Sequence, residues 1–176
     1  MELDKDIIDF EELIYKIEEN YQYIDGVNDF KVELEINSDS IFIGDLKRMS
    51  IVLNNLISNA FKYKDKTKEE SFLKIVFNCN KDSVEIKLED NGIGIADKDK
   101  DNVFDMFYRA TMLSTGSGLG LYIVKETIDK LGGKISIDSE FGIGTNFTIE
   151  IPNQINSLDN KKNISDSFLE KKKKII

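Results

Sequence analysis

The chain of 176 residues contains no histidine and no tryptophan, and it has one cysteine and one proline. Without histidine it lacks the commonest general base and metal ligand, so its chemistry must use carboxylates, amides, lysine, arginine and backbone groups. The single cysteine, Cys79, excludes an internal disulfide. Its neighbours at alternating positions, Leu73, Ile75 and Phe77, are apolar and predict a buried thiol in the core.

Membrane signals and an excess of positive charge are also absent. No apolar run approaches the roughly 20 residues that a membrane span needs, and the N-terminus is too acidic for a signal peptide. The 33 acidic residues outnumber the 24 basic ones and give a formal net charge of −9. Such a domain repels nucleic acid phosphates and anionic membrane surfaces, so we expect neither as a partner. We predict a cytoplasmic domain, whether or not a parent protein is membrane-anchored.

Hydrophobic periodicity predicts the helices and strands. Apolar residues at spacings of three and four predict helices over residues 6–21, about 45–63 with Asp45 as N-cap, and about 120–131. Alternation predicts strands over residues 31–36, 73–80, 83–90, 134–139 and 145–151, with a further short strand over 40–43. The strands follow one another as hairpins in this interpretation.

The order of these elements predicts the fold. Strands and helices are mixed without a regular βαβ repeat, which favours an α+β fold. We expect a two-layer α/β sandwich, in which one mixed sheet is covered on one face by three helices. The domain is predicted to span residues 1–152, because Pro152 stops the last strand. The polar residues 153–176, which end in LEKKKKII, are predicted to form a mostly disordered tail.

The predicted long helix carries an unusual polar stripe. Asn55, Asn59 and Lys62 lie on roughly the opposite side from the apolar stripe. Asparagine is a poor helix former, and a merely solvated face would favour glutamate or lysine. Amide oxygens suit a hard cation such as Mg²⁺, and an ammonium group suits phosphate. A solvated face and a ligand site are both compatible with this stripe taken alone.

Two glycine-rich segments follow. Residues 90–95, DNGIGI, come directly after a predicted strand, and they fit either a turn or a carboxylate beside a closely approaching ligand. Residues 116–121, GSGLGL, begin a predicted helix, where backbone N–H groups favour phosphate. They lack the preceding strand of a dinucleotide fold and the Gly-Lys-Ser/Thr of a P-loop. A flexible loop is the alternative for this second segment.

An aromatic segment lies between the glycine-rich segments. In residues 104–109, FDMFYR, ordinary core aromatics are one interpretation of Phe104 and Phe107. The other is that these rings pin the base of a mobile lid that carries Arg109.

In this order and spacing the chain resembles the ATP-binding catalytic domain of sensor histidine kinases, in the wider superfamily of gyrase, Hsp90-type chaperones and mismatch-repair ATPases. The resemblance covers about residues 5–152. The matching segments are residues 55–63 (the N box), 90–95 (the G1 box), 104–109 (the F box), 116–121 (the G2 box) and 142–147, GIGTNF, a final glycine-threonine motif. Each is weak alone, but five in register exclude coincidence. The implied fold is the Bergerat-type α/β sandwich.

The resemblance implies roles for individual residues. Asn59 is implied to ligate Mg²⁺ with Asn55 assisting, and Asp90 to accept a hydrogen bond from the adenine amino group. Lys62 and Arg109 are implied to contact phosphates, so Asn55, Lys62 and Arg109 would be the catalytic residues. The other residues implied to bind ATP are Tyr63, Gly92, Gly94, Ile95, Phe107, Gly116, Gly118, Leu119, Gly120, Leu121 and Thr145.

The resemblance also implies how those residues act. Tyr63 would pack near the adenine, Thr145 would support its pocket, and the glycines of the G1 box would let the base approach. The glycines of the G2 box would cradle phosphates under a lid formed by about residues 96–117. Sensor histidine kinases carry their phosphoacceptor histidine on a helical hairpin before this domain. We therefore expect the chain to be the catalytic piece of a longer kinase that serves a downstream response regulator.

Two other functions compete with histidine phosphorylation. ATP-hydrolysing relatives of the gyrase and chaperone type place a glutamate four residues before the magnesium asparagine, to activate water. The matching residue here is Asn55, which cannot act as a base. A nucleotide-sensing module without catalysis is the third possibility, and the intact set of ligand positions disfavours it.

Overall fold

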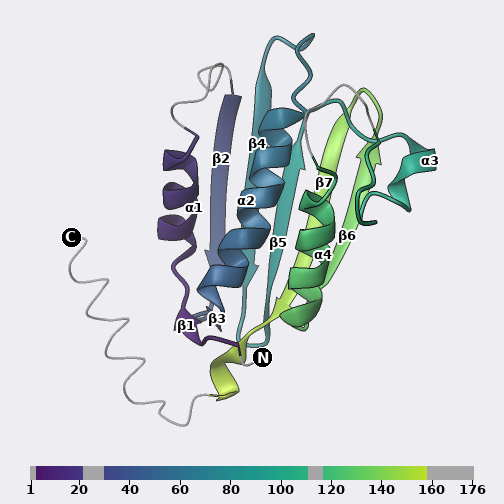
Figure 1. Ribbon diagram of the computed structural model, residues 1–176. Coiled ribbons are helices and arrows are strands. Elements are labelled where there is room, and N and C mark those ends of the chain that lie inside the picture. Colours follow the sequence, from purple (N-terminus) through teal and green to yellow (C-terminus); the bar gives the residue numbers. More distant parts are fainter. Residues whose placement is uncertain (1–2, 22–29, 111–116, 158–176) are drawn as a thin grey trace.

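The computed structural model describes residues 3–21, 30–110 and 117–157, and its centre is one five-stranded sheet (Figure 1). The strand order is β2-β4-β5-β7-β6. The strands are β2 (Phe30–Ser38), β4 (Ser71–Cys79), β5 (Ser83–Asp90), β7 (Gly144–Pro152) and β6 (Lys134–Glu140). β2 pairs with β4 in parallel and the other pairs are antiparallel, which confirms the predicted mixed sheet.

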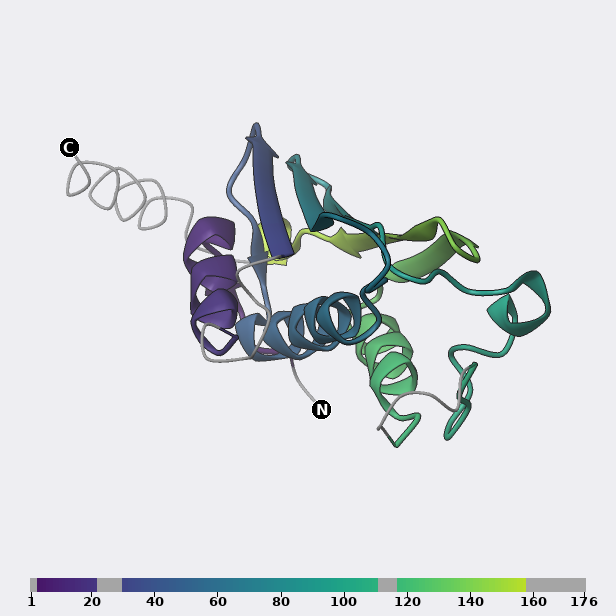
Figure 2. The same ribbon diagram turned by 90° about the horizontal axis from the view of Figure 1, so that it is seen from above.

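Three helices cover one face of this sheet. They are α1 (Phe10–Glu19), α2 (Leu46–Lys62) and α4 (Gly120–Lys130). Figure 2 shows them in one layer on the same side of the strands, as the sequence predicted. A fourth, short helix, α3 (Asp97–Lys100), was not expected and lies beyond the edge strand β6, which it contacts.

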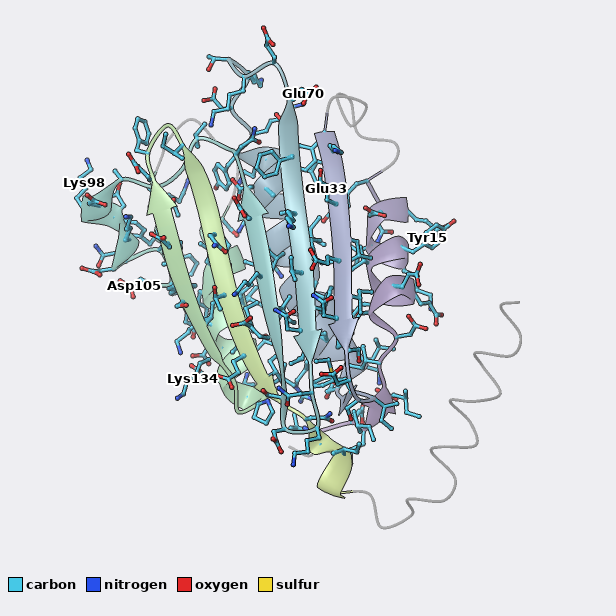
Figure 3. The ribbon with its side chains drawn as sticks, turned by 180° about the vertical axis from the view of Figure 1, so that it is seen from behind. Tyr15, Glu33, Glu70, Lys98, Asp105 and Lys134 are labelled. Atoms are coloured by element: carbon cyan, nitrogen blue, oxygen red, sulfur yellow. The ribbon has the colours of Figure 1, made fainter. Side chains whose placement is uncertain are left out.

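The core lies between the two layers. Alternate strand residues such as Ile75, Ile86 and Ile149 are fully buried against the apolar stripe of α2, and Cys79 is buried with them as predicted. The other face of the sheet carries charged side chains, including Glu33 (Figure 3), which pairs with Lys31. Among the described residues, no helix combines the length and apolar character needed to cross a bilayer.

The predicted first hairpin is wrong. β2 does not turn back onto residues 40–43, and instead pairs in parallel with β4, which lies much later in the sequence. The short strand β3 (Ile43–Gly44) pairs with β1 (Asp6–Ile7) in a separate two-stranded sheet. Phe42 and Ile43 are almost fully buried. Neighbouring residues of a strand point to opposite faces of the sheet, so pairing with β2 would turn one of the two toward solvent. Burial of these two residues therefore outweighs the local pairing.

The position of β2 at the sheet edge limits its burial. Its predicted apolar face is only partly covered, and Leu34 and Ile36 are each 38% exposed. The first helix also begins later than expected, because Asp6–Ile7 belongs to β1 and Asp9 caps α1 through the Glu12 N–H at 3.1 Å.

The packed part of the chain continues past Pro152. Asn153 is buried, its side-chain oxygen accepts from the Ile43 N–H at 3.0 Å, and its amide donates to the Ile41 and Asn80 carbonyls at 2.8 and 3.1 Å. A 3₁₀ turn, Gln154–Ser157, follows. Through these hydrogen bonds Asn153 links the end of β7 to residues 41–43, next to and within β3. The rest of the predicted tail, residues 158–176, lies outside the described residues.

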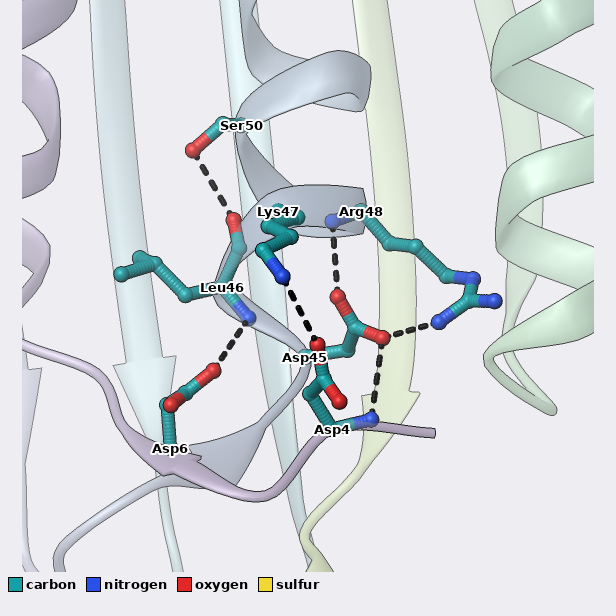
Figure 4. A network of polar contacts seen from close by, with 7 residues as sticks. All are labelled: Asp4, Asp6, Asp45, Leu46, Lys47, Arg48 and Ser50. Atoms are coloured by element: carbon teal, nitrogen blue, oxygen red, sulfur yellow. Dashed lines mark hydrogen bonds and ion pairs between the residues drawn. The ribbon is translucent and has the colours of Figure 1, made fainter. Parts of the chain in front are cut away.

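A charged network fixes the start of α2 (Figure 4). Asp45, 1% exposed, is the predicted N-cap: it accepts from the Arg48 N–H at 2.9 Å and pairs with the Arg48 guanidinium. It also accepts from the Asp4 N–H at 3.1 Å, while Asp6 accepts from the Leu46 N–H at 3.3 Å. Burial acts to raise the pKa of Asp45. The hydrogen bonds from Arg48 and Asp4 and the Arg48 charge outweigh burial and lower this pKa below 3.8. The network ties β1 to α2.

Replacement of Asp45 by alanine should therefore destabilise the fold strongly. We expect a loss of about 2–4 kcal/mol, because a cap is removed and the Arg48 charge loses its buried partner. Since the pKa of Asp45 is lowered by folding, its contribution is present above pH 3.8 and is lost as the pH falls through the lowered pKa. Urea unfolding at several pH values measures both effects.

The matched control is Asp9→Ala, which removes a cap of the same type from an exposed site. It should cost only about 1 kcal/mol. Equal losses for the two variants would contradict a special role for the Asp45 network.

Candidate functional site

A pocket with a cavity volume of about 380 Å³ opens between α2, α4 and the end of β5. This size lies within the roughly 300–1,000 Å³ of small-molecule sites. The predicted residues that line it are Asn55, Asn59, Lys62, Tyr63, Asp90, Gly94, Ile95, Arg109, Gly118, Leu119, Gly120, Leu121 and Thr145. Residues that were not predicted individually also line it, some of them inside the motifs: Ser58, Ile93, Val103, Tyr108, Ala110, Ser117, Ile123 and Phe147.

Asp90 forms one end of the pocket. It is the last residue of β5, and it pairs on one side with Leu73 and on the other with Thr145. Its carboxylate accepts from the Gly92 N–H at 2.8 Å and from the Thr145 N–H. Burial raises the pKa of Asp90 despite these bonds. A rigid central strand thus presents a partly desolvated acceptor to the cavity.

The G1 glycines pack closely against other backbone segments. A Cβ on Gly92 would lie 2.6 Å from the Tyr63 carbonyl oxygen, and Gly92 does not line the pocket. Gly94 has a φ of 65°, and a Cβ there would lie 2.0 Å from the Glu140 carbonyl oxygen. Both glycines therefore let other backbone segments approach, namely the end of α2 and the β6–β7 turn. That they also let the base approach stays a prediction.

A hydroxyl pair supports this end of the pocket. Ser139 and Thr145 are buried opposite each other on β6 and β7, with their oxygens 2.9 Å apart. Ser139 also accepts from the Ile95 N–H at 2.9 Å and donates to the Gly144 carbonyl at 2.8 Å. Ser139 was missed because its sequence neighbours form an ordinary alternating strand.

The other end of the pocket lies where α2 faces α4. Asn55 donates its amide to the Ile51 carbonyl at 2.8 Å, which leaves its oxygen directed at Gly120. A Cβ on Gly120 would lie 3.2 Å from the Asn55 oxygen and 4.0 Å from the Asn59 oxygen. Both amide oxygens therefore converge on the first turn of α4, which brings the N and G2 boxes together as predicted.

The start of α4 differs from that of the other long helices. Asp9 and Asp45 cap α1 and α2 through side-chain bonds. In the described part of the chain α4 has no such cap, because its N-cap residue is Leu119, and its first turn carries no acidic residue. The first N–H groups of a helix have no partner within it, and they carry partial positive charge. This end of the pocket can therefore hold an anion.

Cationic and aromatic side chains complete the wall. Lys62 is exposed at the end of α2, with its ammonium 4.9 Å from the centre of the Tyr63 ring. Arg109 reaches the pocket from the segment between α3 and α4. The sequence placed all three residues at the site, and the structure brings them to one cavity.

The segment after α3 is anchored by Tyr108. Its hydroxyl donates to Asp99 at 2.6 Å, and Asp99 raises the pKa of Tyr108. The Phe107 N–H donates to the Gly118 carbonyl at 3.0 Å, which joins the F box to the G2 box. Phe107, predicted to bind the nucleotide, does not line the pocket. Its φ is 66° and its ring is 66% exposed outside the pocket, because the chain reverses there. Gly116 lies outside the described residues.

Residues 44–155 match the family described as histidine kinase-, DNA gyrase B- and HSP90-like ATPases, and this is more than half of the chain. The chain belongs to this ATPase family. Its residues from the N box to the final glycine-threonine motif all fall inside the matched range.

Similar proteins narrow the assignment within the ATPase family. The sensor protein kinase WalK of Staphylococcus haemolyticus is 35% identical over 88% of this chain, and WalK of Bacillus subtilis is 37% identical over 77%. Among solved structures, the mycobacterial sensor histidine kinase MprB is 25% identical, with a TM-score of 0.70 over 85% of this chain and 98% of its own. The chain is thus an ATP-binding catalytic domain of the sensor histidine kinase type. It spans 26% and 21% of the lengths of the two WalK proteins.

Proposed function

We propose that this chain binds Mg-ATP and transfers the γ-phosphate to a histidine on a helical hairpin of the parent kinase. The observation that carries the proposal is that the two ends of one pocket differ in chemistry: one offers a hydrogen-bond acceptor and the other a site for an anion. Asp90 offers a partly buried acceptor at one end, and the start of α4, which has no side-chain cap among the described residues, offers an anion site at the other. A nucleotide has the matching pair of groups, a base with an amino donor and a polyanionic triphosphate.

The base would lie at the Asp90 end. The carboxylate would accept from the adenine amino group, and this bond is strong because the acceptor is charged and partly desolvated. Tyr63, Ile93 and Ile95 supply apolar wall beside it. Gly92 would act indirectly, because its N–H donates to the Asp90 carboxylate and so holds that carboxylate in place.

The triphosphate would lie at the α4 end. The N–H groups at the start of α4 would bind phosphate oxygens, as helix N-termini commonly do. Lys62 and Arg109 would neutralise the charge that develops on the transferring group. The amide oxygens of Asn55 and Asn59 fit a hard cation, and Mg²⁺ held there would orient the phosphates and reduce their charge.

The transfer itself needs an acceptor from another segment. In the proposed step an imidazole nitrogen forms the N–P bond while the bond from the γ-phosphorus to the bridging oxygen breaks and ADP leaves. The chain has no histidine, so the imidazole must come from the hairpin. Phosphoryl transfer depends mainly on positioning and charge neutralisation, and this pocket supplies both.

Hydrolysis of ATP is the second candidate, and Asn55 argues against it. Its side chain is an amide that bonds the Ile51 carbonyl, so it cannot remove a proton from water.

From the phosphorylated hairpin, a downstream response regulator would receive the phosphoryl group. We infer that the domain works in the cytoplasm, where ATP is available.

Supplying the acceptor separately tests this function. The chain should bind Mg-ATP as a monomer, hydrolyse it poorly and never label itself on histidine. With the parent hairpin added as a separate polypeptide, it should phosphorylate the hairpin slowly. Slow transfer is expected because a covalent link normally provides an effective concentration on the order of millimolar. The measurement is acid-labile, base-stable incorporation of γ-labelled phosphate. Fast ATP turnover without acceptor would contradict the proposal and favour hydrolysis.

A further inference from the structure

A lysine outside all five motifs lies beside the Asp90 end of the pocket without lining the cavity. Lys68 belongs to the loop between α2 and β4. Asp65 folds this loop, because its carboxylate accepts from the Thr67 N–H at 2.9 Å and from the Thr67 hydroxyl at 2.7 Å. The Lys68 N–H then donates to the Asp65 carbonyl at 3.2 Å. This turn fixes the direction in which the Lys68 side chain leaves the loop.

The Lys68 ammonium bonds two separate segments. It donates to the Asn91 carbonyl at 2.7 Å and to the Ile143 carbonyl at 2.8 Å, and it lies 3.4 Å from the Gly92 carbonyl. An ammonium has three N–H donors, so three carbonyl oxygens use them all. One segment follows β5 and the other is the β6–β7 turn. Lys68 comes from a third segment, the α2–β4 loop, and bonds both.

These two segments hold Asp90 in place. The Gly92 N–H donates to the Asp90 carboxylate, and Gly144 packs so closely that a Cβ would lie 2.0 Å from the Asp90 carbonyl oxygen. The charged groups that act on Asp90 are Lys68 and Glu89. Burial raises the pKa of Asp90, and the Lys68 charge works in the opposite direction.

We propose that Lys68 is a positioning residue of the nucleotide site, which clamps the segments around Asp90 and so maintains the acceptor for the adenine amino group. This inference rests on the proposed function. Lys68 touches neither the cavity nor the reacting atoms in this arrangement, and it acts through Asp90.

The test compares Lys68→Met with Lys66→Met. Lys66 is an exposed lysine of the same loop, so its replacement gives the same change of charge without the clamp. Calorimetric titration of the whole chain should give ATP binding about three- to tenfold weaker for Lys68→Met. GTP binding should not change, because guanine lacks the amino donor at that position. Lys66→Met should resemble the unchanged chain with both nucleotides.

The pH dependence of ATP affinity provides a second test, because a purely structural role of Lys68 would not change it. ATP affinity should fall on acidification as Asp90 becomes protonated. Without the Lys68 charge, Glu89 remains as the charge acting on Asp90 and the carboxylate is harder to ionise, so this fall should begin at a higher pH in Lys68→Met. If Lys68→Met fails to fold, Lys68→Gln keeps amide donors at the position and allows the same comparison.

A double-mutant cycle separates this inference from the function on which it rests. In an Asp90→Ala background, Lys68→Met should cause no further loss of ATP affinity. If Asp90→Ala alone leaves ATP affinity unchanged, the proposed adenine contact is wrong. If Asp90→Ala weakens binding but Lys68→Met behaves like Lys66→Met, or weakens ATP and GTP equally, the positioning role is wrong.

Discussion

Asp90→Ala should weaken ATP binding by roughly ten- to a hundredfold, which corresponds to about 1.5–3 kcal/mol. The side chain is the charged acceptor at the base end of the pocket, and its loss leaves the adenine amino group without a partner. Discrimination of ATP over GTP should decrease as well, because GTP presents a carbonyl oxygen at that position. Calorimetric titration with both nucleotides measures the two effects.

Asp82→Ala is the matched control for this substitution. Asp82 is an exposed aspartate just before β5 begins, at the opposite end of the strand from Asp90. It should leave both affinities unchanged. Unchanged ATP affinity in a folded Asp90→Ala chain would remove Asp90 from the site.

Asn59→Ala should lower the rate of phosphoryl transfer to the hairpin by about a hundredfold or more. Its amide oxygen is directed at the first turn of α4, where the proposed magnesium ion and the phosphates would meet. Affinity for Mg-ATP should fall more than affinity for metal-free ATP, because the ligand that is lost belongs to the cation. Transfer assays and titrations with magnesium or with EDTA separate these quantities.

Asn54→Ala provides the comparison within the same helix. Asn54 donates to the Ser50 carbonyl at 2.9 Å, as Asn55 does to Ile51, but it does not line the pocket. Its replacement should leave the magnesium dependence intact. An Asn59→Ala chain that is impaired equally with EDTA and with magnesium would indicate a structural role for Asn59.

Local patterns predicted the elements of this fold well. Asp45 begins α2 as expected, because an N-cap is a contact between residues three apart in the sequence. β5 has the predicted bounds, since alternation of apolar residues is also a local signal. The parallel pairing of β2 with β4 was not predicted. It joins residues about forty positions apart, and no local pattern in either strand specifies that partner.

The same distinction applies to the site. The order of the motifs placed Asn59, Asp90 and Gly120 in one pocket, and the structure brings them together. The backbone contacts of Gly92 and Gly94 were not predicted, because they involve the end of α2 and the β6–β7 turn. Ser139 and Lys68 were missed for a related reason. Each bonds a segment that is distant in the sequence, Ile95 for Ser139 and Ile143 for Lys68, and neither residue interrupts the pattern of its own neighbourhood.

The edge position of β2 has a consequence for how this sequence can diverge. The residues that line the pocket run from Asn55 to Phe147, and the family match begins at residue 44. α1 and β2 precede that point, and they lie at the border of the sheet with Leu34 and Ile36 half-exposed. Neither element lines the pocket, so we expect substitutions in them to affect ATP binding only through packing. Their sequences can change as long as the core stays filled, because Phe10, Leu13, Ile14 and Ile17 of α1 and Phe30 of β2 are buried in it.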